Sequence, residues 1–187
     1  MTAQDDFSSR VCECTEQLAA SGIGALGVLF DLTAQRLVRF AVALTRQQQD
    51  AEDAVQAALT RLASQPQQLA GMARPWAYIL RMVRNEVLAG IRRNQRQRAA
   101  GELTDHITHC PVDEAEREES HRAVWAALRT LPGEQAEVVV LKIWEDMTFA
   151  QIGEVLEVSP HTAASRYKYA MAKLTDRLSR QREALHE

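Results

Sequence analysis

The chain has 187 residues, of which 46% are hydrophobic, 25% are charged and only 5% are aromatic, and its formal net charge is −3. This composition excludes collagen-like, intrinsically disordered and disulfide-scaffold proteins. The length allows one domain or two small ones, with a core that needs no metal or disulfide. An acidic total argues at first against a nucleic-acid partner. Because charges act within a Debye length of about 10 Å, however, the charge has to be counted segment by segment.

The cysteines and the apolar runs indicate the compartment. Cys12, Cys14 and Cys110 are odd in number and form no disulfide framework, so a reducing environment is expected. The N-terminus lacks the basic start of a secretory signal. The longest uncharged run, residues 17–30, is too short and too polar to span a bilayer. We therefore expect a cytoplasmic protein with no membrane insertion.

The first half of the chain has the apolar periodicity of three helices. The first has one predicted apolar stripe, made of Leu26, Phe30, Leu37, Phe40 and Leu44. The second is predicted to begin near Asp50, which can cap it, and to bury Ala51, Val55, Ala58 and Leu62. After a loop over residues 64–75, Pro75 opens a third helix, with a stripe of Trp76, Leu80, Val83, Val87 and Ile91. Three amphipathic helices predict a small bundle.

The second half is also helical, but an acidic stretch separates it from the first. Residues 99–120 lose the apolar periodicity, and their first part is interpreted as a linker. A helix is predicted from Asp113, where Asp113 and Glu116 have capping-box spacing, to Leu131, and another holds Val138, Leu141, Ile143 and Trp144. Thr148 and Gln151 form a second capping box ahead of a short helix that ends near Leu156. Ser159 as N-cap and Pro160 as first residue open a long last helix, whose apolar residues run to Leu178.

The charge is distributed unevenly among these segments. Residues 74–98 contain seven arginines against Glu86, a net +6, and residues 158–187 have a net +3. Residues 99–120, which cover the linker and the start of the fourth predicted helix, have a net −6. Arg81, Arg84, Asn85 and Arg92 fall on the face of their helix away from the apolar stripe. Two basic helices in different domains indicate binding to the phosphates of duplex DNA rather than two solvated faces.

Residues 148–174 have the spacing of a helix-turn-helix motif. Gly153 lies where two helices cross closely, Val158 fills the turn, and a capped second helix follows. Ala163, Tyr167 and Ala170 are predicted to face the core. The opposite face presents His161, Thr162, Ser165, Lys168 and Tyr169 to a major groove. Glu157 occupies a turn position where Gly is usual, because a left-handed conformation costs a non-Gly residue about 1 kcal/mol.

The ordered motifs resemble those of extracytoplasmic-function (ECF) sigma factors, the promoter-recognition subunits of bacterial RNA polymerase. The resemblance spans residues 26–182 and rests on LFDLTAQRLVRFAVALT, DAEDAVQAALTRL, RPWAYILRMVRNEVLAGIRR and LRTLPGEQAEVVVLKIWEDMTFAQIGEVLEVSPHTAASRYKYAMAKL. It implies an all-α protein of two small helical domains. The expected boundaries are an N-terminal extension (1–24), a region 2 bundle (25–98), a flexible acidic linker (99–117), a region 4 helix-turn-helix domain (118–182) and a tail (183–187).

The resemblance also implies roles for particular residues. Those expected to dock on core RNA polymerase are Asp50, Glu52, Asp53 and Gln56. Those expected to contact and melt the minus-ten element are Arg81, Arg84, Asn85, Arg92 and Arg93. Those expected to contact the minus-thirty-five element are His161, Thr162, Ser165 and Lys168 at base edges, and Arg166 and Tyr169 at phosphates. The chain departs from its relatives at Ala57, where an acidic residue is usual, and at Ala164, where a longer polar residue is common.

Melting requires a place for an unstacked base, and we expect it in the loop over residues 65–73. Trp76 continues the apolar stripe and is expected in the core, whereas the sequence leaves the role of Tyr78 open. The family also implies an anti-sigma partner, and no catalytic centre or cofactor is expected. The role of residues 1–24 stays open.

Two alternatives compete with the sigma-factor interpretation. A stand-alone helix-turn-helix regulator would bind an operator as a dimer, but it leaves the acidic helix at residues 50–56 without a role. A zinc-dependent sensor or an enzyme would use the possible ligands Cys12, Cys14, His106, His109 and Cys110. Their spacings match no standard zinc finger, and no orienting carboxylate or oxyanion donor accompanies the cysteines.

Overall fold

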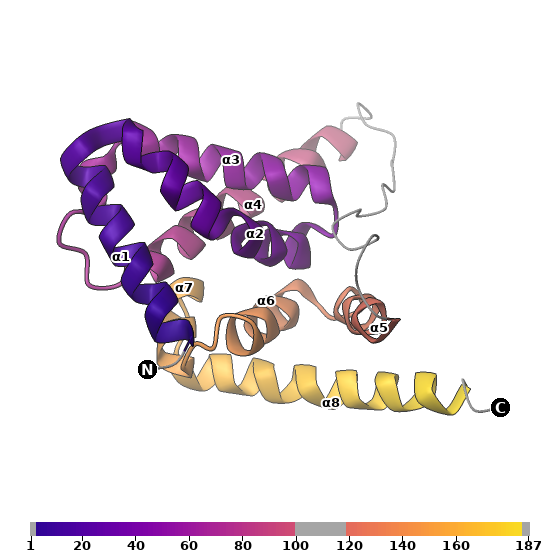
Figure 1. The fold of residues 1–187 in the computed structure, drawn as a ribbon. Coiled ribbons are helices and arrows are strands. Elements are labelled where there is room, and N and C mark those ends of the chain that lie inside the picture. The colour runs from indigo at the N-terminus through magenta and orange to yellow at the C-terminus, as the bar shows by residue number, and fades with distance from the viewer. Residues whose placement is uncertain (1–2, 100–118, 185–187) are drawn as a thin grey trace. The chain divides into compact units, whose positions relative to one another are not determined.

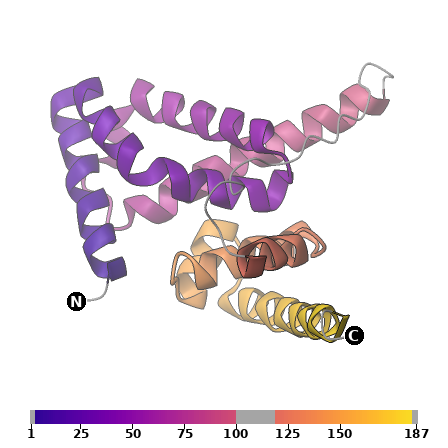
Figure 2. The same cartoon turned by 45° about the vertical axis from the view of Figure 1, so that its right-hand side comes forward.

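The computed structural model describes residues 3–99 and 119–184, and every regular element in them is a helix, as predicted. The chain divides into two compact units, an N-terminal unit (Met1–Thr108) and a C-terminal unit (His109–Glu187). Figures 1 and 2 show the helices of each unit. None of the helices in these residues combines the length and the apolar character that a bilayer span requires. The predicted linker falls almost entirely outside the described residues, as do its His106, His109 and Cys110.

The N-terminal unit contains four α-helices and two short 3-10 helices in the described residues. Their bounds are α1 (Ala3–Ser21), η1 (Gly22–Ala25), α2 (Leu26–Thr45), α3 (Gln48–Ser64), η2 (Pro66–Leu69) and α4 (Pro75–Ala99). Helices α2, α3 and α4 pack on one another, and α1 runs across one end of this group, where it contacts η2 (Figures 1 and 2). The first 24 residues therefore contribute a helix to the bundle.

The predicted stripe of α2 is only partly correct. Leu37 and Phe40 are fully buried, but Leu26 and Leu44 are half-buried and Phe30 is 49% exposed. The buried face continues instead through Leu29 and Thr33. Thr33 can be buried because its hydroxyl donates a hydrogen bond to the Leu29 carbonyl, 2.6 Å away, so that no polar atom is left without a partner.

The start of α3 also differs from the prediction. The helix begins at Gln48, its N-cap is Gln47, and Asp50 lies within the first turn. The backbone amide of the N-cap residue Gln47 donates a hydrogen bond to the Thr45 hydroxyl oxygen over 3.3 Å. Asp50 still suits its place, because a carboxylate in the first turn interacts favourably with the helix dipole. The predicted buried residues Ala51, Val55, Ala58 and Leu62 are confirmed.

The C-terminal unit contains four α-helices in the described residues. They are α5 (Glu119–Leu128), α6 (Gly133–Ile143), α7 (Phe149–Leu156) and α8 (Pro160–Ala184). Helix α8 packs on the other three, and its Ala170 and Leu174 join a core with Leu128, Leu131 and Val139. Residues 113–118, the predicted start of the fourth helix, lie outside the described residues. Ile143, predicted to belong to an apolar helix face, is 49% exposed.

Candidate nucleic-acid interface

The turn between α7 and α8 has the geometry that the sequence predicts for a helix-turn-helix. Glu157 adopts the left-handed conformation, with φ 58° and ψ 41°. The Val158 amide donates a hydrogen bond to the Gly153 carbonyl over 3.0 Å. A Cβ atom at Gly153 would lie 2.6 Å from the Val158 carbonyl oxygen, so only glycine fits there without a shift of the backbone. The close crossing predicted at Gly153 and the left-handed turn predicted at Glu157 are both confirmed.

Side-chain caps fix the start of both helices of the motif. Thr148 and Gln151 form the predicted capping box at α7. At α8 the Ser159 hydroxyl oxygen accepts a hydrogen bond from the Thr162 amide over 3.0 Å. Caps of this kind stabilise a helix by about 1 kcal/mol each. The N-terminal turn of α8 is therefore held rigidly, and such turns favour the negative charge of phosphates.

One face of α8 lies in the core and the other is open. Ala163 and Ala170 are fully buried, and the half-buried ring of Tyr167 packs on Phe149 with centroids 5.7 Å apart. On the other face, His161, Lys168 and Tyr169 are exposed, and Tyr169 keeps 64% of its surface in solvent. Thr162, Ala164 and Ser165 are half-buried. The hydroxyl of Thr162 lies 2.8 Å from that of Ser159, so the helix cap already engages it.

Arg166 differs from the other residues predicted to bind the minus-thirty-five element. Its guanidinium lies 2.8 Å from the Glu134 carboxylate and 3.8 Å from that of Glu137, both on α6. The Arg166 side chain is only 21% exposed and that of Glu137 is 1% exposed. Arg166 thus joins α8 to α6, an arrangement that the sequence pattern did not reveal.

Helix α4 also separates a core face from an outer face. Trp76, Leu80, Val83 and Val87 are buried as predicted, and Ile91 is half-buried. Arg81, Asn85 and Arg92 are spaced i, i+4 and i+11, which places them along one side of the helix. Asn85 and Arg92 are exposed, whereas Arg81 and Arg84 are half-buried. The Arg81 guanidinium carbon lies 5.5 Å from the ring centroid of Tyr78, within cation–π distance.

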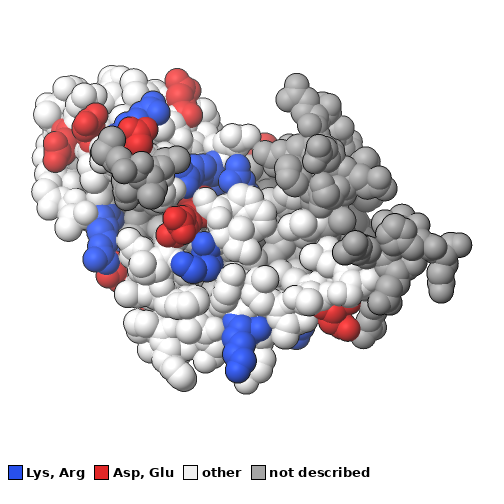
Figure 3. Space-filling view, turned by 60° about the horizontal axis from the view of Figure 1, so that its bottom comes forward, with Lys and Arg blue, Asp and Glu red and all other residues white. Residues whose placement is uncertain are grey.

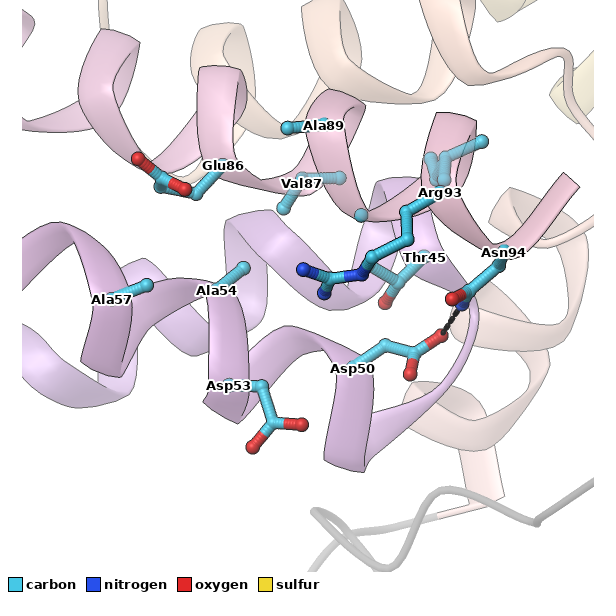
Figure 4. Close-up of a pocket in the computed structure, with 12 residues that line it drawn as sticks. Thr45, Asp50, Asp53, Ala54, Ala57, Glu86, Val87, Ala89, Arg93 and Asn94 are labelled. Atoms are coloured by element: carbon cyan, nitrogen blue, oxygen red, sulfur yellow. Dashed lines mark hydrogen bonds between the residues drawn. The ribbon is translucent and has the colours of Figure 1, made fainter. Parts of the chain in front are cut away.

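Arg93 lies on a different side of α4, facing α3. It lines a polar pocket of about 120 Å³ between these two helices together with Asp50, Asp53 and Asn94 (Figure 4). The Asn94 side-chain amide donates a hydrogen bond to the Asp50 carboxylate over 3.4 Å. Arg93, predicted to contact the minus-ten element, therefore lies beside Asp50 and Asp53, which are predicted to dock on the polymerase.

The remaining residues predicted to dock on the polymerase are exposed on α3. Glu52, Asp53 and Gln56 all lie at the surface, and Ala57 beside them is exposed too. Ala57 lines both the pocket beside Arg93 and a shallower hollow next to Gln56. The small side chain of Ala57 thus stands beside both hollows, at the position where the family resemblance predicts an acidic residue.

The loop between α3 and α4 is polar and partly ordered by its own hydrogen bonds. The Tyr78 hydroxyl donates to the side-chain oxygen of Gln68 over 2.8 Å, and Gln65 and Gln68 also bond to each other. Leu69 is 1% exposed and anchors η2 in the core. The loop is closed by Gly71, whose φ of +67° suits glycine. Tyr78, whose role the sequence leaves open, therefore lies in the first turn of α4 and contacts this loop.

Sequence reasoning missed the contribution of α1. Phe7, Val11, Cys14 and Leu18 recur at i, i+4, i+7 and i+11, and all four are buried. The Phe7 ring packs edge-on against Trp76 with centroids 5.0 Å apart, and the Arg36 guanidinium carbon lies 3.7 Å from its centroid. The periodicity was a signal available in the sequence.

The surroundings of the two cysteines of α1 disfavour their thiolate forms. Burial raises the pKa of the Cys12 thiol, and the charges of Glu16 and Glu13 raise it further. Burial also raises the pKa of Cys14, which Arg10 lowers and Glu13 raises. Within the described residues, no three His, Cys, Asp or Glu side chains come together as metal ligands. His106, His109 and Cys110 lie outside those residues.

Charge on the surface is distributed in small groups. Figure 3 shows one face of the molecule, on which Lys and Arg side chains lie as separate groups among uncharged residues, with acidic side chains near some of them.

An exposed basic face on a four-helix unit, followed by a capped helix-turn-helix in a second unit, defines a two-domain helical DNA-binding protein. Residues 29–97 match the family model of Sigma-70 region 2, and residues 121–174 match that of Sigma-70, region 4. The chain belongs to the ECF sigma factors, which direct transcription initiation at promoters.

Similar proteins agree with this family. The chain is 28% identical over 143 residues to the RNA polymerase sigma-E factor of Streptomyces coelicolor, covering 76% of this chain and 79% of that protein. It is 29% identical over 159 residues to the ECF RNA polymerase sigma factor SigL of Mycobacterium tuberculosis, covering 83% and 90%.

Two solved structures share the fold. One is the sigma factor RpoE in complex with the anti-sigma factor NepR from Bartonella quintana, with a TM-score of 0.66 and 21% identity over 80% of this chain and 94% of that chain. The other is CnrH in complex with the cytosolic domain of CnrY, with a TM-score of 0.62 and 20% identity over 90% and 96%.

Proposed function

We propose that the acidic face of α3 docks on core RNA polymerase while α4 and α8 bind the two promoter elements. Glu52, Asp53 and Gln56 are exposed together on α3, and Asp50 lies one turn away in the pocket shared with α4. A protein partner with a basic surface complements such a face. The boundaries of the functional parts follow the sequence: residues 25–98 for polymerase and the minus-ten element, 99–117 as linker, and 118–182 for the minus-thirty-five element.

In this proposal α4 binds the minus-ten element through its outer face. Arg81, Asn85 and Arg92 form one line of donors, with Arg84 beside it. Long arginine side chains suit backbone phosphates, and an asparagine amide can bond either to a phosphate or to a base edge. Arg93 is exposed, but it lies on a different side of α4, beside Asp53 in the pocket shared with α3.

The outer face of α8 binds the minus-thirty-five element in the major groove. His161, Ser165 and Lys168 face outward from the N-terminal half of the helix, as the recognition helix of this motif requires. Tyr169 offers a hydroxyl to a phosphate, whereas Thr162 and Arg166 first have to release their intramolecular partners. The single observation that carries the proposal is this open polar face on a helix whose opposite face and N-terminus are fixed.

Three further features belong to the proposal. The chain has no catalytic centre or cofactor of its own, because sigma factors are regulators of transcription and the chemistry belongs to the polymerase. It works in the cytoplasm, where promoters and polymerase are found. An anti-sigma protein binds it, as the structures of RpoE with NepR and of CnrH with CnrY support.

A pair of single substitutions tests the assignment of faces. In Arg84→Ala and Lys168→Ala proteins, promoter binding by the holoenzyme should fall while the affinity for core polymerase stays unchanged. Each lost phosphate contact should reduce the slope of log K against log salt by about 0.9. Binding to polymerase is measured by fluorescence anisotropy of labelled protein, with Asp53→Ala as the matched variant that should lose it. Loss of polymerase binding in Arg84→Ala and Lys168→Ala would show that the faces are wrongly assigned.

A further inference from the structure

The N-terminal helix α1 contacts both the loop between α3 and α4 and the first turn of α4. The side-chain amide of Gln67, in η2, donates a hydrogen bond to the Ala19 carbonyl of α1 over 3.0 Å. At the other end of the loop, Phe7 packs edge-on against Trp76, the second residue of α4. Leu18 of α1 and Leu69 of η2 are both buried in this part of the bundle. One helix therefore restrains both the middle of the loop and the residue that follows it.

The contact at Phe7 is built from several groups. Its ring is 7% exposed and lies between Trp76 and the Arg36 guanidinium, whose carbon is 3.7 Å from the ring centroid. Arg36 in turn donates a hydrogen bond to the side-chain oxygen of Gln4 over 2.7 Å. Two residues of α1, Gln4 and Phe7, thus engage the same arginine of α2. These contacts fix the N-terminal turns of α1. Ala19, near the other end of the same helix, accepts the hydrogen bond from Gln67.

The loop also has contacts of its own. Leu69 is buried, and the amides of Gln68, Ala70 and Met72 donate hydrogen bonds to the carbonyls three residues earlier. Gln65 and Gln68 are exposed, and the Tyr78 hydroxyl bonds to Gln68. Side-chain amides and a phenol are groups that bond to the edge of an unpaired base or stack on its face.

We propose that α1 positions the loop over residues 65–74 so that it accepts an unpaired base of the minus-ten element. This inference rests on the proposed function and assigns a role to the first 24 residues. Capture of the base supplies part of the free energy of strand separation, and a loop held in one conformation loses less entropy when it binds. Phe7 and Gln67 are positioning residues, and neither has to touch DNA.

Three variants of the full chain test the proposal. Phe7→Ala removes the contact with Trp76 and Arg36, and Gln67→Ala removes only the bond to Ala19. Glu16→Ala, on the exposed side of α1, is the matched control. Each variant is assembled with core polymerase, and initiation is measured on a promoter found by footprinting. A second template has the same promoter with its minus-ten segment left unpaired.

We expect the ratio of initiation on the duplex template to initiation on the unpaired template to fall. The fall should be about tenfold for Phe7→Ala, the size of one lost base contact, and about two- to tenfold for Gln67→Ala, the size of one net hydrogen bond. Glu16→Ala should keep the ratio of the unchanged protein. Hydrogen exchange at the amides of residues 68, 70 and 72 should accelerate in the first two variants only.

The possible outcomes separate the two proposals. If the unchanged protein initiates and both variants keep its ratio, or lose activity equally on both templates, α1 does not position the loop. If the unchanged protein gives no promoter-dependent initiation, the proposed function fails instead. Should Phe7→Ala fail to fold, the ratio measured for Gln67→Ala decides alone, because that substitution leaves the buried face of α1 intact.

Discussion

Helices α4 and α8 are matched in length and differ in how they are held. Each has 25 residues and begins with proline. Helix α4 is fixed by large apolar side chains, since Trp76, Ile79, Leu80 and Val83 are buried among α1, α2 and α3. Helix α8 offers the small Ala163 and Ala170 to its core together with Leu174, and polar groups and a tight turn also fix its position.

This difference bears on the DNA contacts proposed for the two helices. Large apolar side chains are the main anchor of α4. Helix α8 combines apolar contacts, such as those of Leu174, with its cap, the close crossing at Gly153 and the ion pairs of Arg166. Substitutions of the same kind should therefore have different consequences in the two units.

The largest expected effect is a reversal of sign between two Gly→Ala substitutions. Gly153→Ala should destabilise the C-terminal unit by about 1–3 kcal/mol, because the new Cβ would lie 2.6 Å from the Val158 carbonyl oxygen. Gly90→Ala in α4 meets nothing within 4 Å and should stabilise the N-terminal unit by about 0.5–1 kcal/mol. Hydrogen exchange of peptides from each unit measures both changes in stability. Equal effects would contradict the close crossing at Gly153.

A second comparison separates a structural arginine from a lysine proposed to bind DNA, both on α8. Arg166→Ala leaves the buried Glu137 carboxylate without this cation and should cost the C-terminal unit about 1–3 kcal/mol. Lys168→Ala should leave stability within about 0.5 kcal/mol, because Lys168 is exposed. The salt dependence of promoter binding is the second readout. If Arg166→Ala leaves stability unchanged but reduces the salt slope as Lys168→Ala does, Arg166 contacts phosphate rather than joining α8 to α6.

A smaller effect concerns the turn of the motif. Glu157→Gly should stabilise the C-terminal unit by up to about 1 kcal/mol, because glycine adopts the left-handed conformation without strain. Denaturation by urea, followed by hydrogen exchange in α7 and α8, measures the change. Gly71→Ala is the matched test in the other unit, since Gly71 also has a positive φ, and it should destabilise. Destabilisation by Glu157→Gly would mean that interactions of the Glu157 side chain outweigh the strain.

The smallest expected effect concerns the reactivity of the two thiols of α1. The raised pKa values of Cys12 and Cys14 mean that less thiolate is present at pH 7 than in an unstructured peptide. Alkylation of both by iodoacetamide at pH 7 should therefore be slower than that of an unstructured cysteine peptide, and the midpoint of its pH profile should lie above that of the peptide. Peptide mapping by mass spectrometry resolves the two positions. Labelling of Cys14 at pH 7 as fast as that of the peptide would contradict its burial in α1.

Local signals in the sequence were sufficient for most of the helices and for the motif. The capping boxes and proline starts depend on residues that are close in the chain, so Thr148, Gln151, Ser159 and Pro160 were predictable. The close helix crossing at Gly153 and the left-handed conformation of Glu157 were predictable from the spacing of the motif. The apolar stripe predicted for α2 was partly wrong. Leu29 and Phe30 both fit a helical period, and only packing against neighbouring helices decides which of them is buried.

The parts that were not predictable depend on partners far away in the chain. Phe7 meets Arg36 and Trp76 only after α1 crosses the bundle, and Arg166 meets Glu134 and Glu137 only when α8 packs on α6. Arg93 belongs by charge with the other arginines of α4, but the helical turn directs it towards α3. The contacts with DNA and polymerase stay predictions from the family and from the exposed faces.

Run-off transcription tests the central claim most directly. Core RNA polymerase is incubated with genomic promoter fragments in the presence and absence of this chain, and the transcripts are mapped. Initiation at defined sites that depends on the chain, and that fails in a double variant of Arg84→Ala and Lys168→Ala, is the predicted result. Equal initiation without the chain, or none with it, would contradict the assignment of promoter recognition to α4 and α8.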